Sequence, residues 1–224
     1  MSGNEVTLYL DRLLALYEEK LKRFRLSLTI LLAGTVVFFF LIFFPYITLI
    51  GNQESCPNEL DCPELYQSGL EERVSDMTTS WGNIPVSTAE VVAFFPAGAA
   101  CGVMVVSAQL QGLMRLRQAI TQQARKLENP VDVTLIAPLL IDPKQSFFEQ
   151  ILGSLTLLFP SFIVLFSINL ILIRLEALNR SLPYNQNVSF YYRVYLLSSL
   201  LVIYALVKTG WNVFKSRAFE RHQS

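Results

Sequence analysis

The sequence predicts an all-α integral membrane protein with four transmembrane helices and with both termini in the cytoplasm. Three observations lead to this prediction. Hydrophobic residues make up 52% of the 224 residues and charged residues only 16%, whereas about 25% of a typical soluble domain is charged. The charged residues lie in blocks that are separated by long uncharged runs. Lys and Arg are concentrated in alternate segments between these runs.

Four segments are expected to cross the bilayer, because a helix of about 20 apolar residues spans its hydrocarbon core. Residues 26–50 contain no charged side chain, and residues 91–114 and 151–173 form two further spans. The fourth, residues 194–214, is interrupted by Lys208, whose long side chain can reach the interface. The first span follows a charged segment and is longer than the apolar part of a signal peptide, so we expect it to remain as an anchor.

The distribution of Lys and Arg sets the orientation of the chain. Residues 1–25 and 115–150 carry five each, and residues 215–224 carry three. Residues 51–90 carry one, and the short loop at residues 174–193 carries three at or near its edges. We therefore expect residues 1–25, 115–150 and 215–224 to be cytoplasmic and the other two segments to be loops that face outward. This arrangement requires an even number of spans.

The first outward loop contains Cys56 and Cys62 in the sequence CPNELDC. An oxidising compartment allows these residues to form a disulfide. A metal site is the alternative, but no His accompanies the cysteines and their spacing exceeds that of common zinc sites. The glycosylation sequons at Asn179 and Asn187 both fall in the second outward loop, which agrees with the orientation.

Capping boxes are predicted at the start of the second and third spans. Ser87 precedes Glu90 by three residues, and Ser146 precedes Glu149 by three. In this motif the hydroxyl and the carboxylate each bind a free amide at the start of a helix. The two acids could also serve proton-coupled or ion-coupled transport, but capping explains them without a further function, so we favour it.

Two amphipathic segments are predicted on the cytoplasmic side. In residues 4–26 apolar residues recur at helical spacing, and this helix could lie in the membrane interface, pack on a partner or continue into the first span. We favour the interface. The second span continues as a long cytoplasmic helix, on which Leu113, Leu116 and Ile120 form an apolar stripe. Another part of the chain or another subunit must cover this stripe.

Small and polar residues within the spans are candidates for helix packing, because lipid is as apolar as the helices themselves. Gly98 and Gly102 form a GxxxG motif, which we expect to pack within the chain more readily than to form a dimer. Asn169 lies in the middle of the third span, and we expect it to form an interhelical hydrogen bond. Together with Ser161 and Ser167 it could alternatively line a pathway.

The sequence contains none of the common catalytic or nucleotide-binding motifs, so we expect neither an enzyme nor a cofactor or metal site. Its formal net charge is zero, which argues against a nucleic-acid partner. We therefore expect a non-catalytic subunit or scaffold of a membrane protein complex that assembles with itself or with larger membrane partners. A small oligomeric channel or transporter with a polar path around the second and third spans is the alternative. Short loops favour a bacterial cytoplasmic membrane over a eukaryotic secretory-pathway membrane.

Overall fold

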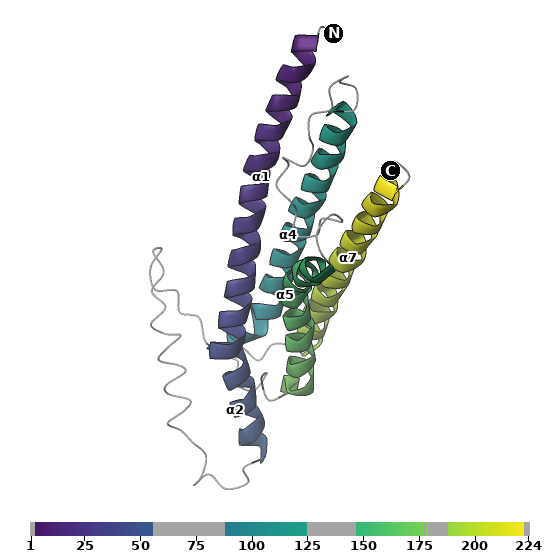
Figure 1. Cartoon of the computed structure of the whole chain (residues 1–224). Coiled ribbons are helices and arrows are strands. Elements are labelled where there is room, and N and C mark those ends of the chain that lie inside the picture. The colour runs from purple at the N-terminus through teal and green to yellow at the C-terminus, as the bar shows by residue number, and fades with distance from the viewer. Residues whose placement is uncertain (1–2, 56–87, 125–146, 177, 179–187, 222–224) are drawn as a thin grey trace. The chain divides into compact units, whose positions relative to one another are not determined.

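A computed structural model of the protein describes residues 3–55, 88–124, 147–176, 178 and 188–221. These residues are helical and contain no strand, so the predicted all-α fold is confirmed for the described part of the chain. The elements in chain order are α1 (Gly3–Phe38), η1 (Phe39–Phe43), α2 (Phe44–Ser55), α4 (Thr88–Ala124), α5 (Phe147–Ile173) and α7 (Val188–Arg221) (Figure 1).

Three helical segments are long and apolar enough to cross a membrane, namely Leu8–Thr48, Thr88–Ala124 and Val188–Trp211. The second of these contains the second predicted span, and the other two cover most of the first and fourth predicted spans. The segment in α7 is of this length even though it contains Lys208. In the third predicted span, the apolar stretch found among the described residues is the shorter Leu158–Ile173. The chain is therefore compatible with a membrane protein by the length and composition of its helices.

The N-terminal segment and the first span form one continuous helix. Of the three alternatives that the sequence left open, the structure contains continuation into the first span, because α1 runs from Gly3 to Phe38 without a break. No Gly or Pro interrupts residues 4–33, and these are the residues that most readily end a helix. The second span likewise continues beyond residue 114, as predicted, as far as Ala124.

A π-helical turn, η1, carries the first span past Pro45. The amide of Phe44 donates to the carbonyl of Phe39, five residues earlier, instead of four. Pro45 has no amide to continue the hydrogen-bond ladder, and a local π adjustment is one way in which a transmembrane helix accommodates a proline. The Thr48 hydroxyl donates to the carbonyls of Phe44 at 3.0 Å and of Pro45 at 2.8 Å.

The chain divides into two compact units. The first contains Met1–Leu32, Val103–Phe159 and Ile203–Ser224, and the second contains Ala33–Gly102 and Pro160–Val202. Each of the long helices α1, α4, α5 and α7 contributes residues to both units.

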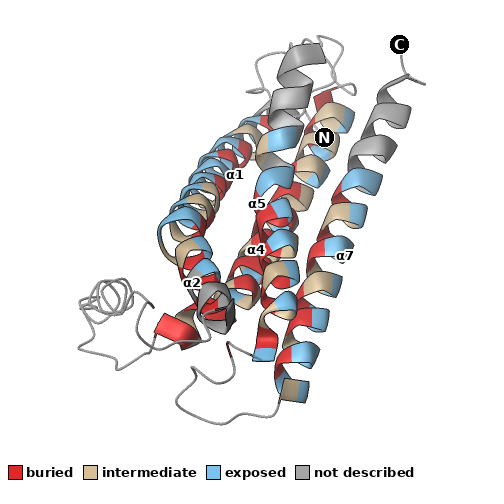
Figure 2. Cartoon of the chain, turned by 90° about the horizontal axis from the view of Figure 1, so that it is seen from below, coloured by how far each residue is buried: buried red, intermediate tan, exposed pale blue. Residues whose placement is uncertain are grey.

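In the first unit the core lies between α1 and α4. Its fully buried members are Leu10, Tyr17, Leu21, Phe24, Leu28, Val106, Leu110, Leu113 and Ile120. Figure 2 shows these helices with buried residues along one side and exposed residues along the other. In the second unit the core is rich in aromatic rings: Phe38 stacks on Phe95 with ring centroids 4.5 Å apart, and Phe43 lies 5.5 Å from Phe95.

Leu113→Ala should lower the free energy of unfolding by about 2–5 kcal/mol, because Leu113 is 1% exposed in the first core and its loss leaves a cavity. Leu16→Ala is the matched control, because Leu16 lies on α1 with 40% of its surface exposed. Denaturant unfolding of the purified protein in detergent measures both. Equal effects of the two substitutions would show that the α1–α4 contact does not form.

Candidate functional site

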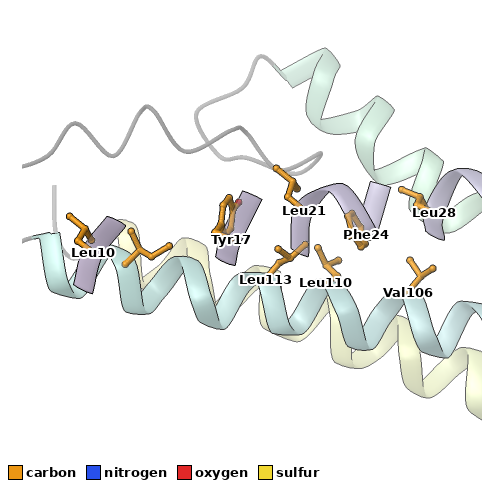
Figure 3. Close-up of a cluster of buried hydrophobic side chains, with 9 residues drawn as sticks. Leu10, Tyr17, Leu21, Phe24, Leu28, Val106, Leu110 and Leu113 are labelled. Atoms are coloured by element: carbon orange, nitrogen blue, oxygen red, sulfur yellow. The ribbon is translucent and has the colours of Figure 1, made fainter. Parts of the chain in front are cut away.

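One side of α4 is buried against α1, because the two helices form an antiparallel pair. The buried or partly buried residues of α1 recur at alternating spacings of four and three, namely Leu10, Leu14, Tyr17, Leu21, Phe24 and Leu28. Those of α4 follow the same rule from Val106 through Leu110 and Leu113 to Arg117, Ile120 and Ala124. This is the heptad spacing of a coiled coil. Figure 3 shows Leu28, Phe24 and Leu21 beside Val106, Leu110 and Leu113 respectively, so the two helices run in opposite directions.

This pairing covers the apolar stripe that was expected to need a partner. Leu113 is 1% and Ile120 is 2% exposed, and Leu116 is partly buried against the same cluster. The covering residues belong to α1 of the same chain. Of the two alternatives that the sequence left open, the structure therefore contains the intramolecular one.

A second side of α4 faces α7. In the second unit the Tyr195 hydroxyl donates to the carbonyl of Ala93 at 3.0 Å, and in the first unit the Ser107 and Thr209 hydroxyls are hydrogen-bonded at 2.7 Å. Both bonds join residues that are 102 positions apart. A constant offset means that the two helices run in the same direction. The buried residues of both helices repeat with this offset: Ala89, Ala93, Pro96, Ala100, Val103 and Ser107 on α4, and Tyr191, Tyr195, Ser198, Val202, Ala205 and Thr209 on α7.

The tyrosine bond lies in the turn that precedes Pro96. The proline has no amide to donate to the carbonyl of Val92, and its ring disturbs the turn that precedes it. Ala93 lies in that turn, and its carbonyl accepts the Tyr195 hydroxyl. A side chain of a neighbouring helix thus binds backbone next to a proline, as happens in transmembrane helices.

A polar cluster lies between α1, α4 and α7 in the first unit. Ser107 donates to the carbonyl of Ala205 at 3.4 Å and accepts from Gln111 at 3.4 Å, in addition to its bond to Thr209. The Gln109 amide nitrogen donates to the Ser27 hydroxyl at 3.3 Å. These bonds connect three helices in an otherwise apolar environment, so they can fix the positions of the helices along one another's axes.

The outer face of α4 lies opposite these two sides. We define it by exposed residues at alternating spacings of four and three, namely Phe94, Gly98, Cys101, Val105 and Ala108. A Cβ atom added at Gly98 would meet no atom of the described residues within 4 Å. The expectation of close packing within the chain is therefore not met at Gly98, and Gly102 is only partly buried. The reason is that α4 uses its other two sides for α1 and α7.

The three polar residues of the third span do not share a face of α5. Ser161 and Ser167 are 1% and 0% exposed, and their hydroxyls have no hydrogen-bond partner in the described residues. Asn169 is exposed, and no interhelical bond of its side chain is found in that part of the chain. At about 100° per residue, Ser167 lies about 120° around the helix from Ser161, and Asn169 lies about 160° from Ser167. The expected interhelical bond of Asn169 is thus absent from the described structure.

Several predicted site residues lie outside the described residues, namely Cys56, Cys62, Ser87, Ser146 and the sequons at Asn179 and Asn187. The described part of α4 starts at Thr88 and that of α5 at Phe147, so the two capping boxes stay predictions. Glu90 lies in the first turn of α4. Glu149 lies in α5, but its side chain is not described.

The contact between α4 and α7 was not predicted from the sequence. A signal for it exists, because small residues recur on α4 at the same alternating spacing that Tyr195, Ser198 and Thr209 follow on α7. The chemistry of this contact is that of helix packing. Within the described residues no group of three or more His, Cys, Asp or Glu is arranged to hold a metal ion.

Comparison of the chain with protein-family models, curated proteins and solved structures found no match.

Ser107→Ala should lower the free energy of unfolding by about 0.5–1.5 kcal/mol, because it removes the hydrogen bonds to Thr209 and Ala205. Ser167→Ala is the matched substitution at a buried hydroxyl without a partner in the described structure, and it should leave the stability unchanged or raise it. Reversible unfolding in mixed detergent measures both variants. A larger loss for Ser167→Ala than for Ser107→Ala would contradict the hydrogen bonds described here.

Proposed function

We propose that the protein is a non-catalytic four-span membrane subunit that assembles with a second copy or with larger membrane partners. The observation that carries this proposal is the outer face of α4, where glycine, cysteine and alanine are exposed and Gly98 has open space in place of a side chain. Glycine inside a helix costs about 1 kcal/mol relative to alanine. Close approach of another transmembrane helix is the usual compensation for this cost.

The division of the chain into two units supports four spans. Its boundaries fall after residues 32, 102, 159 and 202. Each of these positions lies within one of the four predicted spans, including the third.

The same division groups the connecting segments as the proposed topology does, and the Lys and Arg counts assign each group to a side. The first unit contains the three segments that the charge distribution assigns to the cytoplasm, residues 1–25, 115–150 and 215–224. The second unit contains the two loops assigned to the outside, residues 51–90 and 174–193. Small size and short connecting segments favour a bacterial cytoplasmic membrane.

The stripe of Leu113, Leu116 and Ile120 no longer argues for assembly, because α1 covers it. The alternative function, a small channel or transporter, has less support from the structure than from the sequence. Its proposed path needs Ser161, Ser167 and Asn169 on one side of α5, and these residues point in three directions. Assembly through α4 is therefore the function that the described helices favour.

Cys101 tests the proposal, because it lies on the outer face of α4 and is exposed. In a chain carrying Cys56→Ser and Cys62→Ser, mild oxidation of native membranes should join two copies through Cys101, or join the chain to a partner that exposes a thiol. Gly98→Leu should reduce this product, because the larger side chain separates the helices. The matched control carries Cys101→Ser and Ala100→Cys, since Ala100 is buried, and it should not cross-link.

Native mass measurement after mild detergent extraction provides a readout that does not depend on the thiol. The proposal predicts a dimer or a larger complex that Gly98→Leu dissociates. A monodisperse monomer in the unmodified chain, together with no product from Cys101, would contradict the proposal.

A further inference from the structure

Lys208 is the only charged residue of α7 between Arg193 and Lys215, and it lies near the end of the membrane-long segment Val188–Trp211. An ionisable side chain in such a segment is costly unless a partner stabilises its charge. Its position therefore raises the question of which group neutralises the ammonium.

The structure shows how the lysine is held. Its Nζ atom donates to the Tyr204 hydroxyl at 2.9 Å and lies 5.0 Å from the centre of the same ring. Among the described residues no carboxylate forms an ion pair with Lys208. Two N–H groups of the ammonium and the O–H group of Tyr204 remain as donors. The pair is thus an oriented cation without a counter-ion in the described chain.

Trp211 is a third residue with a donor on the same face. Residues 204, 208 and 211 are spaced by four and three positions, so their side chains follow one another along the helix surface. Tyr204 is 52% exposed and Trp211 is 69% exposed. The indole N–H is a donor, and Trp and Tyr characteristically lie at the level of the lipid headgroups.

Hydrogen bonds within the first unit relate this turn to the start of the first span. Thr209 bonds to Ser107, and two residues further along α4 Gln109 bonds to Ser27. Ser27 lies two residues after Arg25, the last charged residue before the uncharged run of α1. Lys208 and Trp211 are therefore near the level at which the first span leaves the hydrocarbon.

We infer that Tyr204, Lys208 and Trp211 form a binding site for the headgroup phosphate of an anionic phospholipid. Charge complementarity selects an anionic lipid, because the net positive charge of Lys208 has no counter-ion among the described residues and a choline headgroup would add a second cation. The acyl chains have a continuous apolar surface beside the site, formed by the exposed side chains of Leu196, Leu200, Ile203 and Val207. The inference requires that α7 lies in a bilayer, but it does not depend on assembly through α4.

The test uses the full chain reconstituted in nanodiscs that contain equal amounts of phosphatidylglycerol and phosphatidylcholine, followed by native mass measurement of the retained lipids. The unmodified chain should retain phosphatidylglycerol preferentially. Lys208→Gln should reduce that preference about fivefold, the effect of one Lys at an anionic surface. Lys208→Arg should keep most of it, and Tyr204→Phe should reduce it partly.

Lys22→Gln is the matched control, because Lys22 is exposed on α1 and its loss changes the net charge by the same amount. It should reduce the preference less than Lys208→Gln does, because Lys22 is not held beside Tyr204 and Trp211. Equal losses for Lys208→Gln and Lys22→Gln would overturn the inference, since binding would then follow net charge alone. The absence of any preference in the unmodified chain would overturn it as well. Circular dichroism of each variant confirms that the helices are retained.

Discussion

The fold depends on α4, which buries two of its sides at once. One side packs against α1 in an antiparallel pair, and the other packs against α7 in a parallel pair. Because α4 is common to both contacts, its sequence must satisfy two heptad patterns in one helix. What remains is a single outer face, and the proposed assembly uses that face.

The two sides of α4 are built from different residues, and the environment explains the difference. The side that faces α1 continues beyond the predicted span and carries Leu110, Leu113 and Ile120. Beyond the predicted span, where Ile120 lies, burial of such large apolar side chains from water drives the association of helices. The side that faces α7 carries alanines, Pro96 and Ser107. In lipid there is no comparable hydrophobic gain, so close approach and hydrogen bonds provide the stabilisation.

The fold class and most of the helices could be predicted from the sequence, because long uncharged runs and helical spacing are properties of local sequence. Three features could not. The choice among the three alternatives for residues 4–26 stayed open, because α4, which covers the apolar side of residues 10–28, is remote in the sequence. The π turn before Pro45 is one of several ways to accommodate a proline. The partner of Ser107 lies 102 positions away, and spacing along one helix does not identify a residue on another.

The sites were predicted less well than the helices for the same reason. Gly98 and Asn169 were assigned to packing within the chain because of their residue types, yet both are exposed. Residue type indicates that a position suits close packing, but not whether the neighbour is in the same chain. Conversely, Leu113 and Ile120 were recognised as a stripe from spacing alone, and only the structure identified α1 as its cover.

The distance between spin labels on α1 and α4 tests most directly whether α4 holds α1 along its length. Arg12 and Gln122 are both exposed. Their residue numbers have the same sum as those of the facing residues Leu21 and Leu113, so in an antiparallel pair they lie at the same level along the two helices. Spin labels on cysteines introduced at these two sites, in a chain whose native cysteines are replaced, should give a distance distribution with a short mean and a narrow width. Labels at Arg12 and Arg115 should be further apart, because seven residues extend a helix by about 10 Å. A broad distribution for both pairs would show that α1 leaves α4 at the membrane surface, and would contradict the account.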